Sequence, residues 1–206
     1  MKYTISTFVF GFLFVVGLRA STIISVESIT SNPGTSGTFD VSLTNEGPSN
    51  ITVAAFTFGL AVNNPAISFT DANTSTVSNS YIFAGHSLFG PDLTGSNSGQ
   101  SLLVSDVFST PLSGTVVDSG ATFDLGHILF TVGSNSSPGP LTVTLDDLAT
   151  SLSDPSGTNI TINTLSNGTL TVTGAPEPSS LLLLLAGLPL FWTRIRRNLD
   201  RRAHQV

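Results

Sequence analysis

Two of the chain's three histidines, His86 and His127, lie among many serines and aspartates and could support nucleophilic or acid–base chemistry. A Ser-His-Asp arrangement needs a serine held on a tight turn, and no Gly-x-Ser-x-Gly motif is present to hold one. His127 precedes Ile128 and Phe130, whose alternation directs them to a core, so we expect His127 to face outward. His86 stands in a glycine-bounded loop. Both are interpreted as surface histidines, no catalytic residue is assigned, and a secreted hydrolase is kept only as an alternative.

Asp146, Asp147 and Asp154 are the residues that could bind a metal, and the metal they suit is calcium. Carboxylate oxygens on loops are ligands for this hard cation, although no EF-hand spacing is present. The other interpretation is that these carboxylates are solvated and that Asp154-Pro155 starts a turn. Because the chain has no cysteine, disulfides, zinc–thiolate sites and cysteine nucleophiles are excluded. Calcium is therefore the one cofactor for which the sequence offers candidate ligands.

Three aromatic residues, Tyr81, Phe83 and Phe89, lie in an irregular, glycine-rich region from Ser78 to Gly120. They could form an aromatic platform for a glycan or a protein partner. They could also pack into a core, which is the favoured interpretation because large aromatic side chains are more often buried than exposed. Both interpretations stay open from the sequence.

The charges are segregated along the chain. No Lys or Arg occurs between Ala20 and Thr193, whereas nearly all of the acidic residues lie in that span. All seven basic residues lie near the two ends: Lys2, Arg19, Arg194, Arg196, Arg197, Arg201 and Arg202. A purely anionic body cannot neutralise phosphates, so nucleic acid is excluded as a partner. The body must also be stabilised by apolar burial and hydrogen bonds rather than by Lys or Arg salt bridges.

Period-two alternation fills the region between the two ends and predicts half-buried strands. The alternating segments are 38–44, 56–62, 128–132, 141–145, 160–162 and 170–172, with shorter strands expected at 101–104 and 107–108. Turn signals separate them, such as Asn32-Pro33-Gly34 and Asn167-Gly168. The apolar phase changes after Val53, which predicts a β-bulge near Ala54-Ala55. The pattern predicts an all-β protein with a single β-sandwich over 21–174.

The two ends differ from this body in composition. Residues 1–20 have a lysine, an apolar stretch over 5–18 and a small residue at the end, which is typical of a signal peptide read by the Sec export machinery. The alternative is a retained membrane anchor, but the apolar stretch is shorter than the roughly 20 residues that a span needs. We expect an N-terminal signal helix that is removed on export.

Residues 175–206 form the second end segment. A proline-stiffened spacer is followed by an apolar run over 181–192 and then by the arginine cluster. We expect a short hydrophobic helix in the inner membrane, with Trp192 at the interface and Arg194, Arg196 and Arg197 on the cytoplasmic side. The alternative is a simple C-terminal membrane anchor.

This tail resembles the PEP-CTERM sorting signal. The resemblance lies in Pro176-Glu177-Pro178-Ser179-Ser180, then the leucine-rich run, then the basic cluster, and it occurs together with a signal peptide. It implies an exported protein of a Gram-negative bacterium that makes extracellular polysaccharide. It also implies recognition by an exosortase near Pro176, Glu177 and Pro178, followed by removal of the hydrophobic and basic part. This chain departs from the pattern in Pro189, inside the apolar run, and in a long ending over 198–206.

The body is similar to cohesin-like β-sandwiches. Gly37–Val41 fits their early strand, Asp124–Val132 fits a later one, and Asp154–Ile160 with Gly168–Val172 fits the closing pair. The similarity implies a nine-stranded, jelly-roll-like fold used for binding. It does not imply dockerin as the partner, and no binding residue is carried over.

Taken together, these features predict a non-enzymatic protein of the cell surface or of the extracellular matrix of a biofilm. Its precursor is expected to be held transiently in the inner membrane, and its processed form to reach the cell envelope or the medium and associate with exopolysaccharide. The alternative is an adhesive binding module for a glycan or a protein partner.

Overall fold

The computed structural model describes residues 21–93 and 99–174, which form strands joined by turns and loops. The expected signal helix over 1–20 and the expected hydrophobic helix over 175–206 lie outside the described residues. Across the described ranges, no helix has the length and apolar character to cross a membrane. The strands are β1 (Thr22–Val26), β2 (Ile29–Ser31), β3 (Ser36–Asn45), β4 (Ile51–Val53), β5 (Ala55–Val62), β6 (Ile67–Asn73), β7 (Asp92–Leu93), β8 (Ser101–Val107), β9 (Thr115–Val117), β10 (Thr122–Val132), β11 (Gly139–Ser153), β12 (Asn159–Ile160), β13 (Thr164–Ser166) and β14 (Gly168–Val172).

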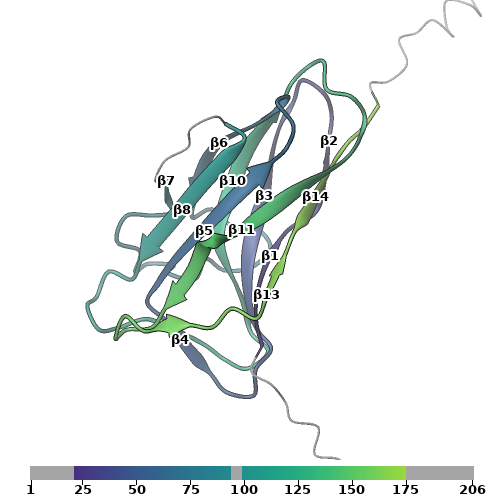
Figure 1. Cartoon of the computed structure of the whole chain (residues 1–206). Coiled ribbons are helices and arrows are strands. Elements are labelled where there is room, and N and C mark those ends of the chain that lie inside the picture. The colour runs from purple at the N-terminus through teal and green to yellow at the C-terminus, as the bar shows by residue number, and fades with distance from the viewer. Residues whose placement is uncertain (1–20, 94–98, 175–206) are drawn as a thin grey trace, which may run out of the picture.

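These strands form two facing sheets and a small third one (Figure 1). The first sheet, sheet A, has the order β13-β1-β3-β10-β6. The second, sheet B, has the order β2-β14-β11-β5-β8-β7, with β12 paired to β11. The prediction of an all-β sandwich is confirmed for the described residues.

The core lies between the inner faces of the two sheets. Sheet A contributes every second residue of β3 and β10, such as Phe39 and Phe130, whose ring centroids are 5.8 Å apart. Sheet B contributes the alternating residues Phe56, Phe58 and Leu60 of β5, all of them buried. Because successive side chains of a strand point to opposite faces of the sheet, the alternating apolar residues of each strand all point into this one layer between the sheets.

The predicted bulge near Ala54-Ala55 is wrong, because the chain changes sheets there. β4 pairs with β9 in a separate two-stranded ribbon, and β5 then joins sheet B. Ala54 is the link, and its amide donates to the Ser153 carbonyl of β11 at 2.8 Å. Changing sheets reverses which face of the chain is inward, and this reversal produced the change of phase in the sequence.

The chain also passes from one sheet to the other near the start and near the end of the described residues, between β1 and β2 and between β13 and β14. The chain pairs with β3 up to Val26 and enters sheet B at Ile29, while β13 lies in sheet A and β14 in sheet B. The two crossings touch at Gly168, where a Cβ would lie 2.6 Å from Val26 Cγ1 and 2.8 Å from the Glu27 carbonyl oxygen. A glycine is required here because a larger residue would separate the two crossing segments.

Candidate binding surface

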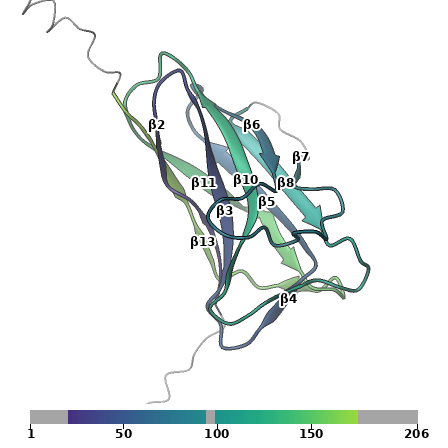
Figure 2. The ribbon, with the colours of Figure 1, turned by 180° about the vertical axis from the view of Figure 1, so that it is seen from behind.

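The irregular segment 74–91 first crosses the outer face of β3 and β10, where residues 77–79 contact Asp40 and Asp124 (Figure 2), and then passes beside β10 toward the end of β8. It contains almost no ladder hydrogen bonds, so other groups must hold it. Three buried carboxylates do so, Asp40, Asp124 and Asp106, each at most 1% exposed. Side chains of this kind are seldom fully buried unless they are paired, and each of these accepts several hydrogen bonds.

Asp40, on β3, is paired with His127 on β10. The histidine Nδ1 lies 2.6 Å from Asp40 Oδ1, and the amides of Val77 and Ser78 donate to Oδ2 at 2.7 and 2.8 Å. Burial alone would raise the pKa of Asp40, but the hydrogen bonds from Ser78, His127 and Val77 outweigh it and hold the pKa below its ordinary value. His127 does face away from the core, as expected, but its side chain is only 12% exposed. The histidine is therefore a half-buried partner of Asp40 rather than a freely exposed side chain.

Asp124, on β10, anchors the next residue of the segment. The Asn79 amide donates to Oδ2 at 2.6 Å, and the Asn79 side-chain amide donates to Oδ1 at 3.1 Å. The Ser42 hydroxyl also donates to Oδ1, at 2.6 Å. The serine nearest to the Asp40–His127 pair on β3 thus donates to a different carboxylate, so these residues form a structural network rather than a nucleophile–base–acid chain.

Asp106, at the end of β8, anchors the last part of the segment. The hydroxyls of Tyr81 and Ser87 donate to Oδ2, both at 2.5 Å, and the Val107 amide donates to Oδ1 at 2.7 Å. Burial, reinforced by the hydrogen bond to Asp106, raises the pKa of the Tyr81 phenol far above its ordinary value.

Of the two interpretations of the three aromatic residues, core packing is confirmed for two of them and the platform is wrong for the same two. Tyr81 and Phe83 are 4% and 0% exposed and pack in the core against Phe56, with Phe83 5.6 Å from it in a stacked arrangement. Phe89 alone is exposed, at 73%. His86 is exposed as predicted, and its ring stacks on Phe108 at 5.0 Å.

The calcium candidates Asp146 and Asp154 each accept hydrogen bonds from their own local turn and share no partner. Asp146 accepts the Leu148 amide at 3.0 Å, while Asp154 accepts the amides of Ser156 and Thr158 in its own turn. The Ser156 hydroxyl and these amides hold the pKa of Asp154 below its ordinary value. Over residues 21–93 and 99–174, no three acidic or histidine side chains come close enough to hold a metal.

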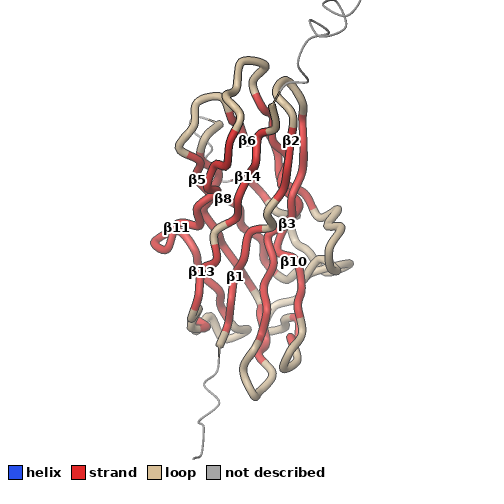
Figure 3. Tube along the Cα trace, turned by 90° about the vertical axis from the view of Figure 1, so that its right-hand side faces the viewer, coloured by secondary structure: helices blue, strands red, loops and turns tan. Residues whose placement is uncertain are grey.

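A surface that the sequence did not reveal lies on the outer face of sheet B. The register of β11 against β5 shifts between Asp146, opposite Gly59, and Ser151, opposite Thr57. The extra residues leave the sheet as a protrusion, visible beside the β11 label in Figure 3. Its tip is Leu148, which is 98% exposed.

This protrusion is an ordered structure. The Thr150 hydroxyl donates to the Asp146 carbonyl at 2.6 Å, and the Gly59 amide donates to Thr150 Oγ1 at 3.4 Å. A Cβ on Gly59 would lie 2.8 Å from Ala149 Cβ, so the missing side chain lets the protrusion lie directly on β5. We call Leu148 and the hollow of about 210 Å³ beside it the bulge surface; the hollow is lined by Gly59, Leu60, Ala61, Ser101, Leu102, Leu103, Asp146 and Ala149.

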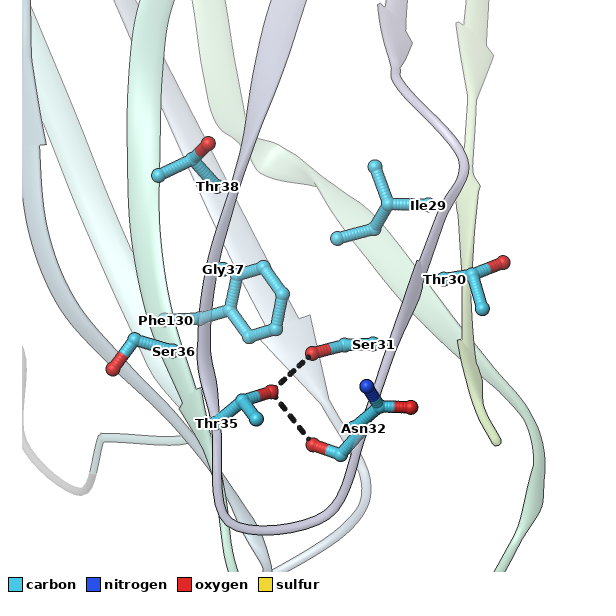
Figure 4. A pocket seen from close by; sticks show the side chains of 9 residues that line it. All are labelled: Ile29, Thr30, Ser31, Asn32, Thr35, Ser36, Gly37, Thr38 and Phe130. Carbon is cyan, nitrogen blue, oxygen red and sulfur yellow. Dashed lines mark hydrogen bonds between the residues drawn. The ribbon is translucent and has the colours of Figure 1, made fainter. Parts of the chain in front are cut away.

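A second concavity opens where β2 and β3 separate into the two sheets (Figure 4). Thr35 Oγ1 lies 3.1 Å from Ser31 Oγ and donates to the Asn32 carbonyl at 2.8 Å, which closes one end of it. We call this groove of about 460 Å³ the β2–β3 groove; its lining is Ile29, Thr30, Ser31, Asn32, Thr35, Ser36, Gly37, Thr38 and Phe130.

Comparison with solved structures supports the cohesin-like expectation for the fold. The chain is similar to the cohesin CaCohA2 of Clostridium acetobutylicum, seen in solution (18% identity, 76% of this chain, 94% of that one, TM-score 0.56). It is also similar to a non-cellulosomal cohesin of the archaeon Archaeoglobus fulgidus (17% identity, 75% and 93% covered, TM-score 0.55).

A third similar structure is the sixth cohesin of Acetivibrio cellulolyticus scaffoldin B, in complex with a Cel5 dockerin (15% identity, 74% and 99% covered, TM-score 0.56). Identities this low show a shared fold and nothing finer. No protein-family model and no curated protein matches the chain.

Proposed function

We propose that this chain is an exported, non-catalytic binding module whose sandwich docks a protein partner through the bulge surface. The observation that carries the proposal is Leu148, which an ordered protrusion holds 98% exposed beside a shallow hollow. Exposing a large apolar side chain on a rigid support has no benefit for folding. Burying it against a partner would contribute about 1.5–3 kcal/mol.

The chemistry of the bulge surface favours a protein over a charged polymer. Its floor consists of small or apolar residues such as Gly59, Ala61 and Leu103, and Asp146 is the charged residue of the lining. A shallow hollow with a largely apolar floor and one carboxylate at its border, beside one projecting leucine, fits an interface with an apolar centre and a polar rim. A cohesin sandwich in complex with a dockerin is a precedent for protein binding by this fold.

Site-specific photocrosslinking tests this proposal in cells of the source organism. A photoreactive phenylalanine is placed at Ala61, which is exposed on the floor of the hollow. We expect one discrete adduct with a protein in the envelope or the medium, and we expect Leu148→Asp to abolish it.

The matched control is Leu112→Asp, because Leu112 is 84% exposed but lies in the loop after β8. This control should leave the adduct unchanged. An adduct that survives Leu148→Asp, or that both variants abolish, would show that the leucine on the protrusion is not the contact.

Export and sorting form the second part of the proposal. Its support is the sequence: a signal-peptide pattern over 1–20 and a PEP-CTERM-like tail with Pro176, Glu177 and Pro178 before an apolar run and an arginine cluster. The tail would hold the precursor in the inner membrane until an exosortase removes it, and the acidic body would then remain among exopolysaccharides at the envelope or in the medium.

Two epitope tags test the sorting part independently of binding. A tag inserted after Ser21 should be found at the envelope or in the medium, and a tag after Val206 should be absent from that mature form. Recovery of both tags on one cytosolic chain would contradict export while leaving the binding proposal to the crosslinking experiment.

A further inference from the structure

The β2–β3 groove exists because one sheet position is vacated. β1 pairs with β3 as far as Val26 opposite Val41 and then leaves sheet A. β3 extends beyond that point to Ser36, and over 36–40 its ladder neighbour among the described strands is β10 alone. On the other side of the groove, β2 pairs with β14 and with no other described strand. Two strand edges therefore face each other across the groove.

The backbone groups that point into the groove follow from the alternation of hydrogen bonds along a strand. Thr35 accepts from the Val132 amide on the β10 side, whereas Asp40 accepts from the Glu27 amide on the β1 side. Even-numbered residues of this part of β3 therefore direct their amide and carbonyl groups toward the vacated position. These residues are Ser36, Thr38 and Asp40.

The protein satisfies one of these three edge positions with its own atoms. The Asp40 amide donates to the Glu27 carboxylate at 3.1 Å, and its carbonyl accepts the Glu27 amide at 3.0 Å. At the other end, the Thr35 hydroxyl closes the groove against Ser31 and Asn32. Between these two closures, the edge groups of Ser36 and Thr38 face the groove without a ladder partner in the described part of the chain.

The lining of the groove suits an extended, uncharged backbone. In Figure 4 the Ile29, Ser31 and Phe130 side chains point into it, while Thr30 points away. A Cβ on Gly37 would lie 2.5 Å from Phe130 Cζ, so the glycine lets the ring form the floor. The nine lining residues carry no charge. Hydroxyl groups and an apolar floor can accept an uncharged segment, and the edge groups supply hydrogen bonds at strand spacing.

We infer that the β2–β3 groove binds a short, uncharged, extended segment of another polypeptide, which adds to β3 at Ser36 and Thr38 in the position that β1 vacates. This site is separate from the bulge surface and does not depend on it.

Amide hydrogen exchange by NMR on the full chain is the first test. The Thr38 amide should exchange rapidly, in contrast to the Phe39 amide, which lies in the β3–β10 ladder. Protection of Thr38 equal to that of Phe39 would overturn the inference, because the edge would already have a partner. Protection that disappears when the chain is ended at Gly174 would overturn it also, by assigning the groove to the chain's own C-terminal segment.

An array of random seven-residue peptides is the second test. We expect uncharged peptides rich in β-branched residues to be enriched, and the best of them to protect the Thr38 amide on titration. Ser31→Trp fills the groove and should weaken this peptide at least tenfold, whereas Thr30→Trp, on the next residue but pointing away, should change its Kd less than twofold.

Melting temperatures of both variants show that they fold. If Ser31→Trp does not fold, Ser31→Leu replaces it with the same expectation. Equal binding by the groove-filling variant and the Thr30→Trp control, or no peptide enriched above background, would overturn the inference.

Discussion

The hydrogen bond between Tyr81 and Asp106 gives the sharpest prediction about how segment 74–91 is held. Tyr81→Phe removes one hydroxyl and leaves the ring in its core position, 4% exposed. The lost bond is the 2.5 Å contact to a buried carboxylate that also accepts from Ser87 and Val107. A hydrogen bond to a charged group contributes about 1.5–3 kcal/mol, so we expect the free energy of unfolding to fall by about 2 kcal/mol.

Asp106→Ala is the more severe change at the same place. It leaves the buried Tyr81 hydroxyl and the Val107 amide without their acceptor, and each such donor costs about 1–3 kcal/mol. We expect a loss of about 4 kcal/mol. Asp118→Ala is the matched control, since Asp118 is an exposed carboxylate bonded to Asn50, and it should cost less than about 0.5 kcal/mol.

Urea unfolding followed by far-ultraviolet circular dichroism measures these differences. Tyrosine fluorescence is unsuitable because Tyr81 is the only tyrosine of the body, and Trp192 lies in the tail. The Tyr81→Phe variant should also melt roughly 4–8 °C lower, at about 2–4 °C per kcal/mol for a domain of this size. A Tyr81→Phe protein within 0.5 kcal/mol of the parent would refute the account of how the segment is anchored.

Three further predictions concern the acidic body. Since the folded pKa of Asp40 lies below its ordinary value of 3.8, its contribution to stability is complete above that value and is lost as the pH falls further. Asp40→Asn should therefore flatten the dependence of unfolding free energy on pH in that range, and an unchanged slope would contradict the hydrogen bonds from Ser78, His127 and Val77 that lower this pKa. Gly37→Ala should destabilise by about 1–3 kcal/mol through contact with Phe130, while Gly174→Ala, with open space around it, should be neutral in the same melts. Trypsin should leave the urea-unfolded body intact in mass spectra, because no Lys or Arg occurs between Arg19 and Arg194; tryptic fragments from within would contradict this.

The strands of the sandwich could be predicted where one sheet face is buried. The alternation over 38–44 and 56–62 corresponds closely to β3 and β5, because period two reports burial directly. β1 and β6 were not predicted, although Ile24 and Phe69 are buried, because their alternation is short. The change of sheet at Ala54 could not be told from a bulge, since both reverse the inward face.

The binding surfaces were harder to predict for physical reasons. Leu148 follows two aspartates in a strand that otherwise alternates, and only its register against β5 shows that it projects from the sheet. The sequence analysis assigned no role to Asp106 and Asp124, because the donors to these carboxylates come from positions far along the chain. The one signal available was their place in strands whose neighbours are apolar.

The affinity of the module for its crosslinked partner, once identified and purified, shows whether the bulge surface is the site at which that partner binds. Titration calorimetry on the parent chain, Leu148→Asp and Leu112→Asp should show at least a tenfold larger Kd for Leu148→Asp and an unchanged Kd for Leu112→Asp, as expected from burying one leucine. Equal affinity of all three proteins would show that the partner binds elsewhere and would contradict the assignment of the bulge surface.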